Sequence, residues 1–382
     1  MTGGPRTSLA LDDLLASAPG DWAIAAPPGS DPHRWLALLT TGLREDARLS
    51  AYGQYLTRID LLRRARAVRE LSEAAVNDRS DGPPGPVLVI GGLPRTATTL
   101  LHTLAAGSDD VWVPRSWEYD RPGLIGATTE RERRVAEAES AERLAGFARI
   151  SPDFGAIHPM AATAPEECDE LLAHCFDSFR MLIQYDLPTY RAEWLTSDHS
   201  HAYALLATAL RRVDQIDAAG ATRRLRVLKA PGHLHAYETL RRHLPGAVVV
   251  QIHRSVSELL PSWVDLIGST RSAFSTAVAP RDQLLAEWLA VFSAMVDRGL
   301  AARDASPSGW IGLHYDDLVA DPGRVWLGVL ETVTRSTLGG GATEVDVLEA
   351  PPARAYDRSL PHSMAPAIED LDERYRRLVF GD

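Results

Sequence analysis

The sequence predicts an α/β protein: a parallel sheet of the phosphate-loop type flanked by helices, with a helical region before the sheet and a helical insertion inside it. Three observations support this prediction. Four short apolar runs, each bounded by turn residues, are typical of buried parallel strands. Helical stretches separate these runs, as crossover helices do. The first run leads through a glycine turn directly into a helix, which is how phosphate-binding loops are built.

The N-terminal part of the chain is predicted to be helical. Across residues 8–76, apolar and charged residues recur at helical spacing, and no run resembles a strand. Prolines and glycines at residues 81–86 end this pattern, because neither residue favours a helix interior. We therefore divide the chain into a helical N-terminal region, residues 1–85, and an α/β domain, residues 86–382.

The α/β domain begins with the first strand and contains a long insertion. The four predicted strands are residues 87–90, 225–228, 248–252 and 310–313. Between the first two lies the insertion, about residues 117–223, which is rich in helical patterns. Its charged start, residues 130–139, is expected to form a solvated helix face. An insertion at the carboxyl end of a strand is well placed to form a lid or an acceptor pocket.

The composition argues against several classes of protein. The 51 acidic residues outnumber the 40 basic ones, and the net charge of -11 argues against a protein that coats nucleic acid or an anionic membrane. Cys168 and Cys175 are too few for a disulfide scaffold and match no common zinc spacing, so we expect no metal and a cytoplasmic location. No stretch reaches the roughly 18 apolar residues of a membrane span. The oligomeric state is left open.

The strongest motif starts at residue 87, where the apolar run and glycine turn precede a helix that begins with Thr98 and Thr99. Unpaired backbone amides at a helix start favour a phosphate, and hydroxyl groups and Arg95 complete such a site. Ala97 and Thr98 stand where a nucleoside triphosphatase has Gly and Lys, so the loop is not of that kind. Taken alone, the motif also fits an ordinary strand-to-helix turn.

A second motif follows the predicted strand at residues 248–252. Ser255 and Glu258 have the spacing of a capping box, which places a helix start after the strand and Arg254 at its mouth. Ser262 lies eight residues beyond Arg254, and we expect the arginine side chain to fold back toward it. The pair then forms a second phosphate site. The alternative is a salt-bridged arginine at a helix entrance beside a serine bonded to its own backbone.

Lys229 stands out in the composition. It is the only lysine among 40 basic residues, the other 39 being arginine. A compact ammonium group can enter a narrow site that the wide guanidinium fork cannot. We therefore interpret Lys229 as a residue aimed at a small anion, with chance survival on the surface as the alternative.

The two phosphate motifs resemble those of sulfotransferases that use 3′-phosphoadenosine 5′-phosphosulfate (PAPS). Gly92-Leu-Pro-Arg-Thr-Ala-Thr-Thr-Leu-Leu-His102 is similar to the 5′-phosphosulfate loop of this superfamily, especially of the bacterial family with a Pro-Arg-Thr-Gly-Thr-Thr-Leu-Leu loop. Arg254 and Ser262 resemble the superfamily's 3′-phosphate site.

Two further segments extend the resemblance, which runs from about residue 86 to 325 with all four motifs in order. Residues 314–322 are similar to a segment whose tyrosine, here Tyr315, lies near the adenine, and residues 228–233 resemble a Lys-Ser/Thr-Pro-x-His segment. The resemblance implies that the donor nucleotide is bound by Arg95, Thr96, Ala97, Thr98, Thr99, Leu100, Arg254, Ser262 and Tyr315.

The chain departs from the family pattern at three places. Ala97 replaces a loop glycine, so the backbone there must avoid positive φ or tolerate strain. Ser255 and the residue after it replace an Asp-Pro or Asn-Pro pair. The glycine-rich carboxyl-terminal segment of cytosolic eukaryotic relatives is absent, and we expect the stretch around Arg354 and Arg358 to take its place.

The activity that the resemblance implies is in-line transfer of a sulfuryl group from PAPS to a hydroxyl of a small-molecule or lipid-like metabolite. Arg95 and Lys229 would neutralise the charge that develops. Two residues are candidates for the base: Glu118, in a Trp-Glu pair like that of the bacterial family, and His233, in the segment that supplies a catalytic histidine in cytosolic relatives. A salt-bridged carboxylate and a core histidine are the structural alternatives.

Other residues and other functions stay open at this point. His158, Glu166 and Glu167 resemble a His and Glu-Glu motif of the bacterial family, which makes them candidates for the lining of the acceptor pocket, although surface glutamates explain the pair equally well. A magnesium- and ATP-dependent kinase is one alternative function, against which the missing loop lysine counts. An inactive nucleotide-binding module is the other.

Overall fold

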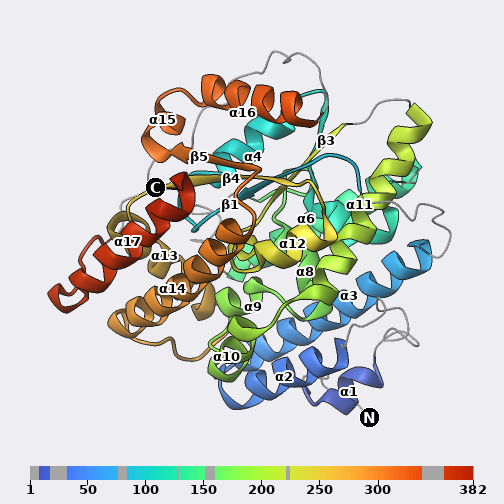
Figure 1. Ribbon diagram of the computed structural model, residues 1–382. Helices are drawn as coiled ribbons and strands as arrows, with labels where there is room; N and C mark the ends of the chain where they lie inside the picture. Colours follow the sequence, from blue (N-terminus) through green and yellow to red (C-terminus); the bar gives the residue numbers. More distant parts are fainter. Residues whose placement is uncertain are drawn as a thin grey trace, which may run out of the picture.

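The computed structural model describes residues 8–17, 32–75, 84–126, 129–150, 160–220, 224–337 and 357–381. At the centre of this described part lies a sheet of five parallel strands in the order β2-β3-β1-β4-β5 (Figure 1). The strands are β1 (Val87–Gly91), β2 (Val111–Trp112), β3 (Leu225–Lys229), β4 (Val248–His253) and β5 (Trp310–His314). The predicted α/β fold class is confirmed.

Sequence periodicity located four of the five strands. Strands β1, β3, β4 and β5 begin at the predicted residues, and each ends one residue later than predicted. Strand β2 was not predicted, because two residues are too few to form a recognisable apolar run. It extends the sheet on the outer side of β3.

The rest of the described chain is mainly helical, as predicted for the N-terminal region and the insertion. Before the sheet lie α1 (Leu11–Leu15), α2 (Pro32–Glu45) and α3 (Ala51–Ala75). The insertion contains α5 (Ser116–Asp120), η1 (Pro122–Leu124), α6 (Glu130–Ile150), α8 (Cys168–Leu172), η2 (Ala173–Cys175), α9 (Phe179–Gln184), α10 (Pro188–Thr196) and α11 (Ser200–Gly220). The others are α4 (Thr98–Ala106), η3 (Pro231–Ala236), α12 (Tyr237–His243), α13 (Val256–Ser272), α14 (Arg281–Ala305), α15 (Tyr315–Ala320), α16 (Pro322–Thr337), η4 (His362–Met364) and α17 (Ala365–Phe380).

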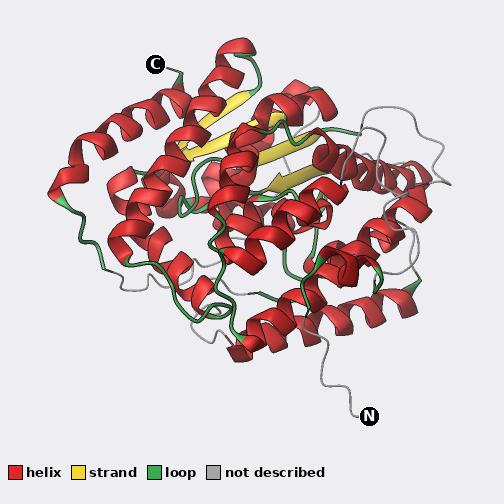
Figure 2. Cartoon of the chain, turned by 90° about the horizontal axis from the view of Figure 1, so that it is seen from below, coloured by secondary structure: helices red, strands yellow, loops and turns green. Residues whose placement is uncertain are grey.

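Helices lie on both faces of the sheet (Figure 2), and all residues of the central strand β1 are buried, whereas the edge strand β5 is partly exposed. Successive strand residues point to opposite faces. On one face, Leu88 and Ile90 of β1 pack in a core shared with Trp326 of α16. On the other face, Val89 belongs to a larger core that includes Leu39 of α2. The N-terminal helices and the sheet therefore share one hydrophobic core.

Within the described residues, no helix combines the length and apolar character needed to cross a bilayer.

Candidate active site

The pairing of the strands brings the predicted motifs to one edge of the sheet. Strand β1 lies between β3 and β4, with Ile90 opposite Lys229 and Gly91 opposite Gln251. All three strands are parallel, so their carboxyl ends meet at the same edge. The loop that follows β1, the side chain of Lys229 and the turn that follows β4 therefore lie next to one another.

The loop between β1 and α4 makes a tight turn in which three residues have positive φ angles. Gly92, Arg95 and Ala97 have φ angles of 108°, 68° and 66°. Ala97 therefore adopts the left-handed conformation that glycine reaches without strain, at a cost of about 1–2 kcal/mol. Thr96 is fully buried, and its hydroxyl donates to the carbonyl of Leu93 at 2.9 Å, so this side chain holds the turn and only its backbone can face a ligand.

Helix α4 presents free amides toward this loop. The first amide in the helix to bond backward is that of Leu101, which donates to the carbonyl of Ala97 at 3.2 Å. The amides of Thr98, Thr99 and Leu100 have no acceptor among the described residues. Such amides and the helix dipole together favour an anion. The Leu100 side chain is buried, so its amide is the part of the residue that can contact a ligand.

The second predicted phosphate site contacts the first directly. The Arg254 guanidinium donates from Nη1 to the Arg95 carbonyl at 3.0 Å and stacks over the Tyr315 ring, 4.3 Å from its centroid. Arg95 in turn donates from Nε to the Ser262 hydroxyl at 3.2 Å. The structure thus brings the residues of three predicted motifs together. It differs in one detail, because Arg254 reaches Glu258 and Arg95 instead of Ser262.

The predicted capping box at the start of α13 is wrong. Helix α13 does begin after Ser255, but the Ser255 side chain forms no capping bond. Glu258 pairs with Arg254 at 3.1 Å, so its carboxylate is not available to the N-cap amide. The amide of Val256 donates instead to Asp372 of α17, at 2.6 Å. A residue more than a hundred positions away in the sequence supplies the cap.

Helix α17 also supports the phosphate loop. The buried Tyr375 hydroxyl accepts a hydrogen bond from the Leu93 amide at 3.0 Å and donates to the Ile252 carbonyl at 2.8 Å. One side chain thereby joins the turns that follow β1 and β4. The sequence had suggested the stretch around Arg354 and Arg358 for a supporting role. Arg354 lies outside the described residues, and Arg358 is exposed.

Lys229 reaches the loop from the end of β3. Its buried ammonium group donates to the Thr99 hydroxyl at 3.2 Å and forms an ion pair with Glu167. The only lysine of the chain is therefore aimed at the first turn of α4, where the free amides lie. Glu167, a candidate for the lining of the acceptor pocket, is the carboxylate that forms the ion pair with this lysine.

A cavity of about 600 Å³ opens beside the loop. Its lining includes Arg95, Thr98, Thr99 and Glu167. Its remaining walls come largely from α3, the insertion and α13, including Leu56, Ile59, Phe147, Ile183, Trp263, Leu266 and Phe274. The N-terminal region and the insertion thus provide much of the cavity wall. The insertion was the segment expected to form an acceptor pocket. His158 lies outside the described residues.

The charged start of α6 matches the predicted solvated face only in part. Arg133 pairs with Glu130 and Glu137 on the helix surface, with 44% of its side chain exposed. Glu139, however, lines the cavity and pairs with Arg121 at 2.8 Å. The end of the charged run therefore faces the pocket.

Neither base candidate from the sequence lines the cavity. Glu118 is buried, and its Oε2 accepts a hydrogen bond from the Arg115 amide at 2.8 Å in the capping box of α5. Burial raises the pKa of Glu118 to about 7. His233 is fully buried, with Nδ1 hydrogen-bonded to the Tyr203 hydroxyl at 2.8 Å. Burial lowers the pKa of His233 to about 3.

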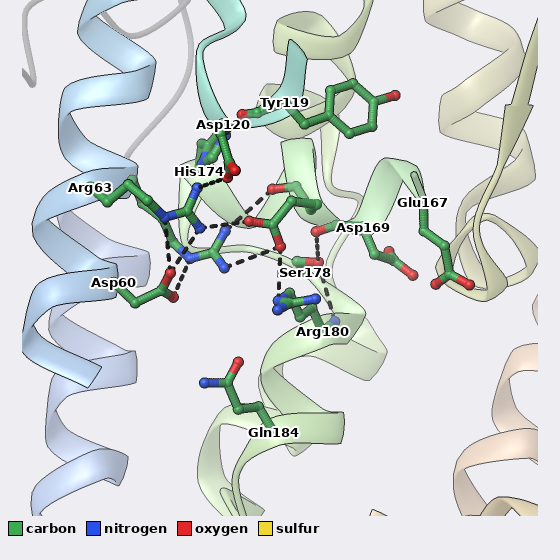
Figure 3. Close-up of polar contacts among 12 residues, drawn as sticks. Asp60, Arg63, Tyr119, Asp120, Glu167, Asp169, His174, Ser178, Arg180 and Gln184 are labelled. Carbon is green, nitrogen blue, oxygen red and sulfur yellow. Dashed lines mark hydrogen bonds and ion pairs between the residues drawn. The ribbon is translucent and has the colours of Figure 1, made fainter. Parts of the chain in front are cut away.

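Sequence reasoning missed a network of charges in the cavity wall. It joins Asp60, Arg63 and Arg64 of α3 to Asp120, Glu170 and Arg180 of the insertion. Figure 3 shows Asp60 and Arg63 reaching from α3, and Arg180 from α9, into this network. The spacing of Asp60, Arg63 and Arg64 on one helix is a local signal. Their partners in the insertion could not be identified without the fold.

Comparisons with known proteins agree with this geometry. Residues 86–333 match the model of a family described as the sulfotransferase family. Sulfotransferase STF1 from Mycobacterium tuberculosis H37Rv has a similar fold, with a TM-score of 0.71 and 23% sequence identity over 97% of this chain and 99% of that one. For sulfotransferase STF9 from Mycobacterium avium the values are 0.68 and 18%, over 98% and 88%. No curated protein sequence matched the chain.

Proposed function

Because this chain belongs to the sulfotransferase family, we propose that it moves a sulfuryl group from PAPS to a hydroxyl group of a small-molecule or lipid-like acceptor. One observation supports the choice of donor above all. The Arg254 guanidinium contacts the Arg95 carbonyl at 3.0 Å, so the two expected phosphate sites lie within reach of one nucleotide. We keep the prediction of a cytoplasmic enzyme that needs no metal.

The residues present suit a nucleotide with two separated phosphates. We propose that the free amides of α4, the hydroxyls of Thr98 and Thr99, and Arg95 hold the 5′-phosphosulfate. Arg254 and Ser262 would hold the 3′-phosphate, and Tyr315, already stacked on Arg254, would lie beside the adenine. These assignments rest on the observed grouping of the side chains and on the family resemblance.

Transfer also requires that negative charge be neutralised where the donor breaks. Lys229 is suited to this role because its ammonium group lies 3.2 Å from the Thr99 hydroxyl at the helix start. Its present partner, Glu167, lines the cavity in which an acceptor would bind. We propose Glu167 as the group that accepts the hydroxyl proton, since Glu118 and His233 lie outside the cavity wall.

Thermal unfolding with adenosine 3′,5′-bisphosphate, without magnesium, tests the nucleotide site. Binding at one hundred times the Kd is expected to stabilise the protein by about 2.7 kcal/mol. Arg254→Ala is expected to weaken binding by about 1.5–3 kcal/mol, the contribution of a charged hydrogen bond. The matched control is Arg335→Gln, which alters an exposed arginine on α16.

Two further outcomes separate the alternatives. Stabilisation by magnesium and ATP alone would favour the kinase. A protein that binds the bisphosphate but transfers no labelled sulfate from PAPS to any acceptor in a panel of phenols and aliphatic alcohols would be an inactive module.

A further inference from the structure

The charge network in the cavity wall contains one arginine with too few partners. The buried carboxylate of Glu170 serves three guanidinium groups: Arg63 at 2.6 Å, Arg64 at 3.3 Å and Arg180 at 2.9 Å. Only 2% of the Glu170 side chain is exposed, so solvent does little to screen these charges. One carboxylate therefore balances three cations at this point.

The other two arginines have carboxylates of their own. Arg63 and Arg64 each pair with Asp60 at 2.7 Å, and Arg63 also pairs with Asp120 at 2.7 Å. Arg180 has only its share of Glu170, through Nε. Glu166, another acid in the pocket wall, forms no ion pair with Arg180 among the described contacts, and it accepts a hydrogen bond from the Ser116 hydroxyl at 2.8 Å.

Arg180 is also the arginine of this network that is most open to the cavity. It lines the pocket, and 35% of its side chain is exposed, against 19% for Arg63 and none for Arg64. No described residue accepts a hydrogen bond from its two terminal nitrogens. These nitrogens form a planar fork whose geometry matches a carboxylate.

The cavity is lined largely by apolar side chains, among them Leu56, Ile59, Phe147, Ile183, Leu266 and Phe274. Its lining also includes Thr99 and Glu167, where the reacting hydroxyl would lie if the proposed function holds. The cavity thus offers a site for a hydroxyl group, apolar walls, and the Arg180 guanidinium, whose terminal nitrogens have no acceptor among the described residues.

We infer that the acceptor is an amphipathic hydroxy acid: a molecule with an apolar body, a hydroxyl that reaches Glu167, and a carboxylate held by the Arg180 fork. This inference rests on the proposed function and adds the chemical class of its acceptor. The acceptor carboxylate supplies the negative charge that Arg180 lacks, because its partner Glu170 is shared with Arg63 and Arg64, which also pair with Asp60. A neutral alcohol of the same length fills the apolar walls but leaves that charge unbalanced.

The test uses ω-hydroxy fatty acids of increasing chain length, each paired with the diol of the same length. Binding to the full-length protein is measured by calorimetry, with and without adenosine 3′,5′-bisphosphate, and turnover is measured with PAPS. For at least one length, the acid is expected to bind about tenfold more tightly than its diol, as a charged hydrogen-bonded pair provides. Arg180→Gln is expected to abolish this preference while diol and bisphosphate binding stay unchanged.

Two further variants guard against a merely structural effect. Arg180→Lys keeps the charge without the fork and is expected to restore only part of the preference for the acid. Arg335→Gln, on the far side of the sheet, is expected to change nothing. Melting curves of all variants show whether the loss of an ion pair with Glu170 has unfolded the protein. If Arg180→Gln is unfolded, the preference for the acid over the diol is judged from Arg180→Lys, which is then expected to show a weaker preference than wild type.

Several outcomes would overturn the inference. Equal binding of acids and diols at every length, or no binding of any acid by a protein that binds the bisphosphate, means that no carboxylate site exists. If Arg180→Gln lowers kcat equally for acids and diols, Arg180 acts on the transferred group instead. Failure of the proposed function looks different: neither bisphosphate binding nor transfer occurs, while the preference for acids can still be measured without nucleotide.

Discussion

Glu167 forms an ion pair with Lys229, the lysine proposed to neutralise the donor, and also lines the cavity that would hold the acceptor. If it accepts the hydroxyl proton, Glu167→Gln is expected to lower kcat by about 10²–10⁴-fold, the usual contribution of a general base. Bisphosphate affinity should change little, because Glu167 is not part of either phosphate site. The measurement is turnover at saturating PAPS, beside Glu118→Gln and His233→Ala. A full rate for Glu167→Gln with a large loss in either of the other two would return the role to that residue.

The raised pKa of Glu118 makes the stability of the protein depend on pH. Burial raises its pKa from the ordinary 4.5 to about 7, so the folded protein keeps a proton that the unfolded chain loses as the pH rises. Between pH 4.5 and 7 this carboxyl therefore lowers the stability by about 3 kcal/mol in total, and no further above that range. Glu118→Gln removes the effect and is expected to gain this amount on wild type between pH 4.5 and 8.

The quantity to compare is the difference in the free energy of unfolding between wild type and Glu118→Gln at each pH. Burial lowers the pKa of His102, His174 and His233 to about 3, and these groups add stability as the pH rises, which opposes Glu118. When urea unfolding of wild type and variant is compared across this pH range, the histidine contribution cancels, because both proteins contain the same histidines. The same substitution at the exposed Glu369 serves as the control. A constant difference between wild type and Glu118→Gln would show that folding does not raise the pKa of Glu118.

At the scale of single residues, the sequence predicted which side chains gather at the loop after β1 better than which acid faces the cavity. Arg95 and Arg254 belong to local motifs, in which a strand end and a helix start fix the position of the side chain. A base is defined by the cavity that it faces, and this cavity is built by α3, α9 and α13 together. Glu118 lies near the loop in the sequence, yet its carboxylate turns to the Arg115 amide.

At the scale of elements, α17 supports the turns that follow β1 and β4, although it lies near the far end of the chain. Tyr375 accepts from Leu93 and donates to Ile252, and it lies so close to Gly92 that a Cβ there would come within 2.6 Å of its hydroxyl. We expect Tyr375→Phe to destabilise the protein by about 1–3 kcal/mol, since it leaves two buried backbone groups unpartnered. Bisphosphate affinity should fall as well, because the loop loses its anchor.

The control for this helix is Tyr55→Phe, which removes a hydroxyl from a partly exposed tyrosine of α3. Calorimetric titration with the bisphosphate and urea unfolding provide the two readouts. A Tyr375→Phe protein that is less stable but binds with unchanged affinity would limit α17 to a structural role.

The same helix marks the limit of what the sequence could predict about elements. Apolar runs located four strands, because a buried strand has a local signature. The Ser255–Glu258 capping box followed an equally local rule and was wrong, since Asp372 provides the cap across a large sequence separation. Contacts of this kind depend on the packing of α17 against β4 and α13, which no local pattern encodes.

At the scale of the molecule, net charge and site charge have opposite signs. The chain carries -11 overall, yet Arg95, Lys229 and Arg254 converge on one edge of the sheet. Parallel strand order achieves this, because β3, β1 and β4 are adjacent and each delivers one of these residues at its carboxyl end. A local basic site within an acidic protein favours a small multivalent anion and disfavours extended polyanions.

The predicted boundary at residue 85 does not divide the hydrophobic core. Leu39 of α2 and Leu71 of α3 lie in the same buried cluster as Val89 of β1 and Val249 of β4. Because the cavity also takes its walls from α3 and α13, the N-terminal helices and the sheet are expected to unfold as one unit. Scanning calorimetry should therefore show a single transition, and the bisphosphate should shift the whole of it upward, since ligand binding to the folded state stabilises the entire cooperative unit. Two transitions, only one of which moves with the nucleotide, would mean that the helical region folds independently and merely rests on the sheet.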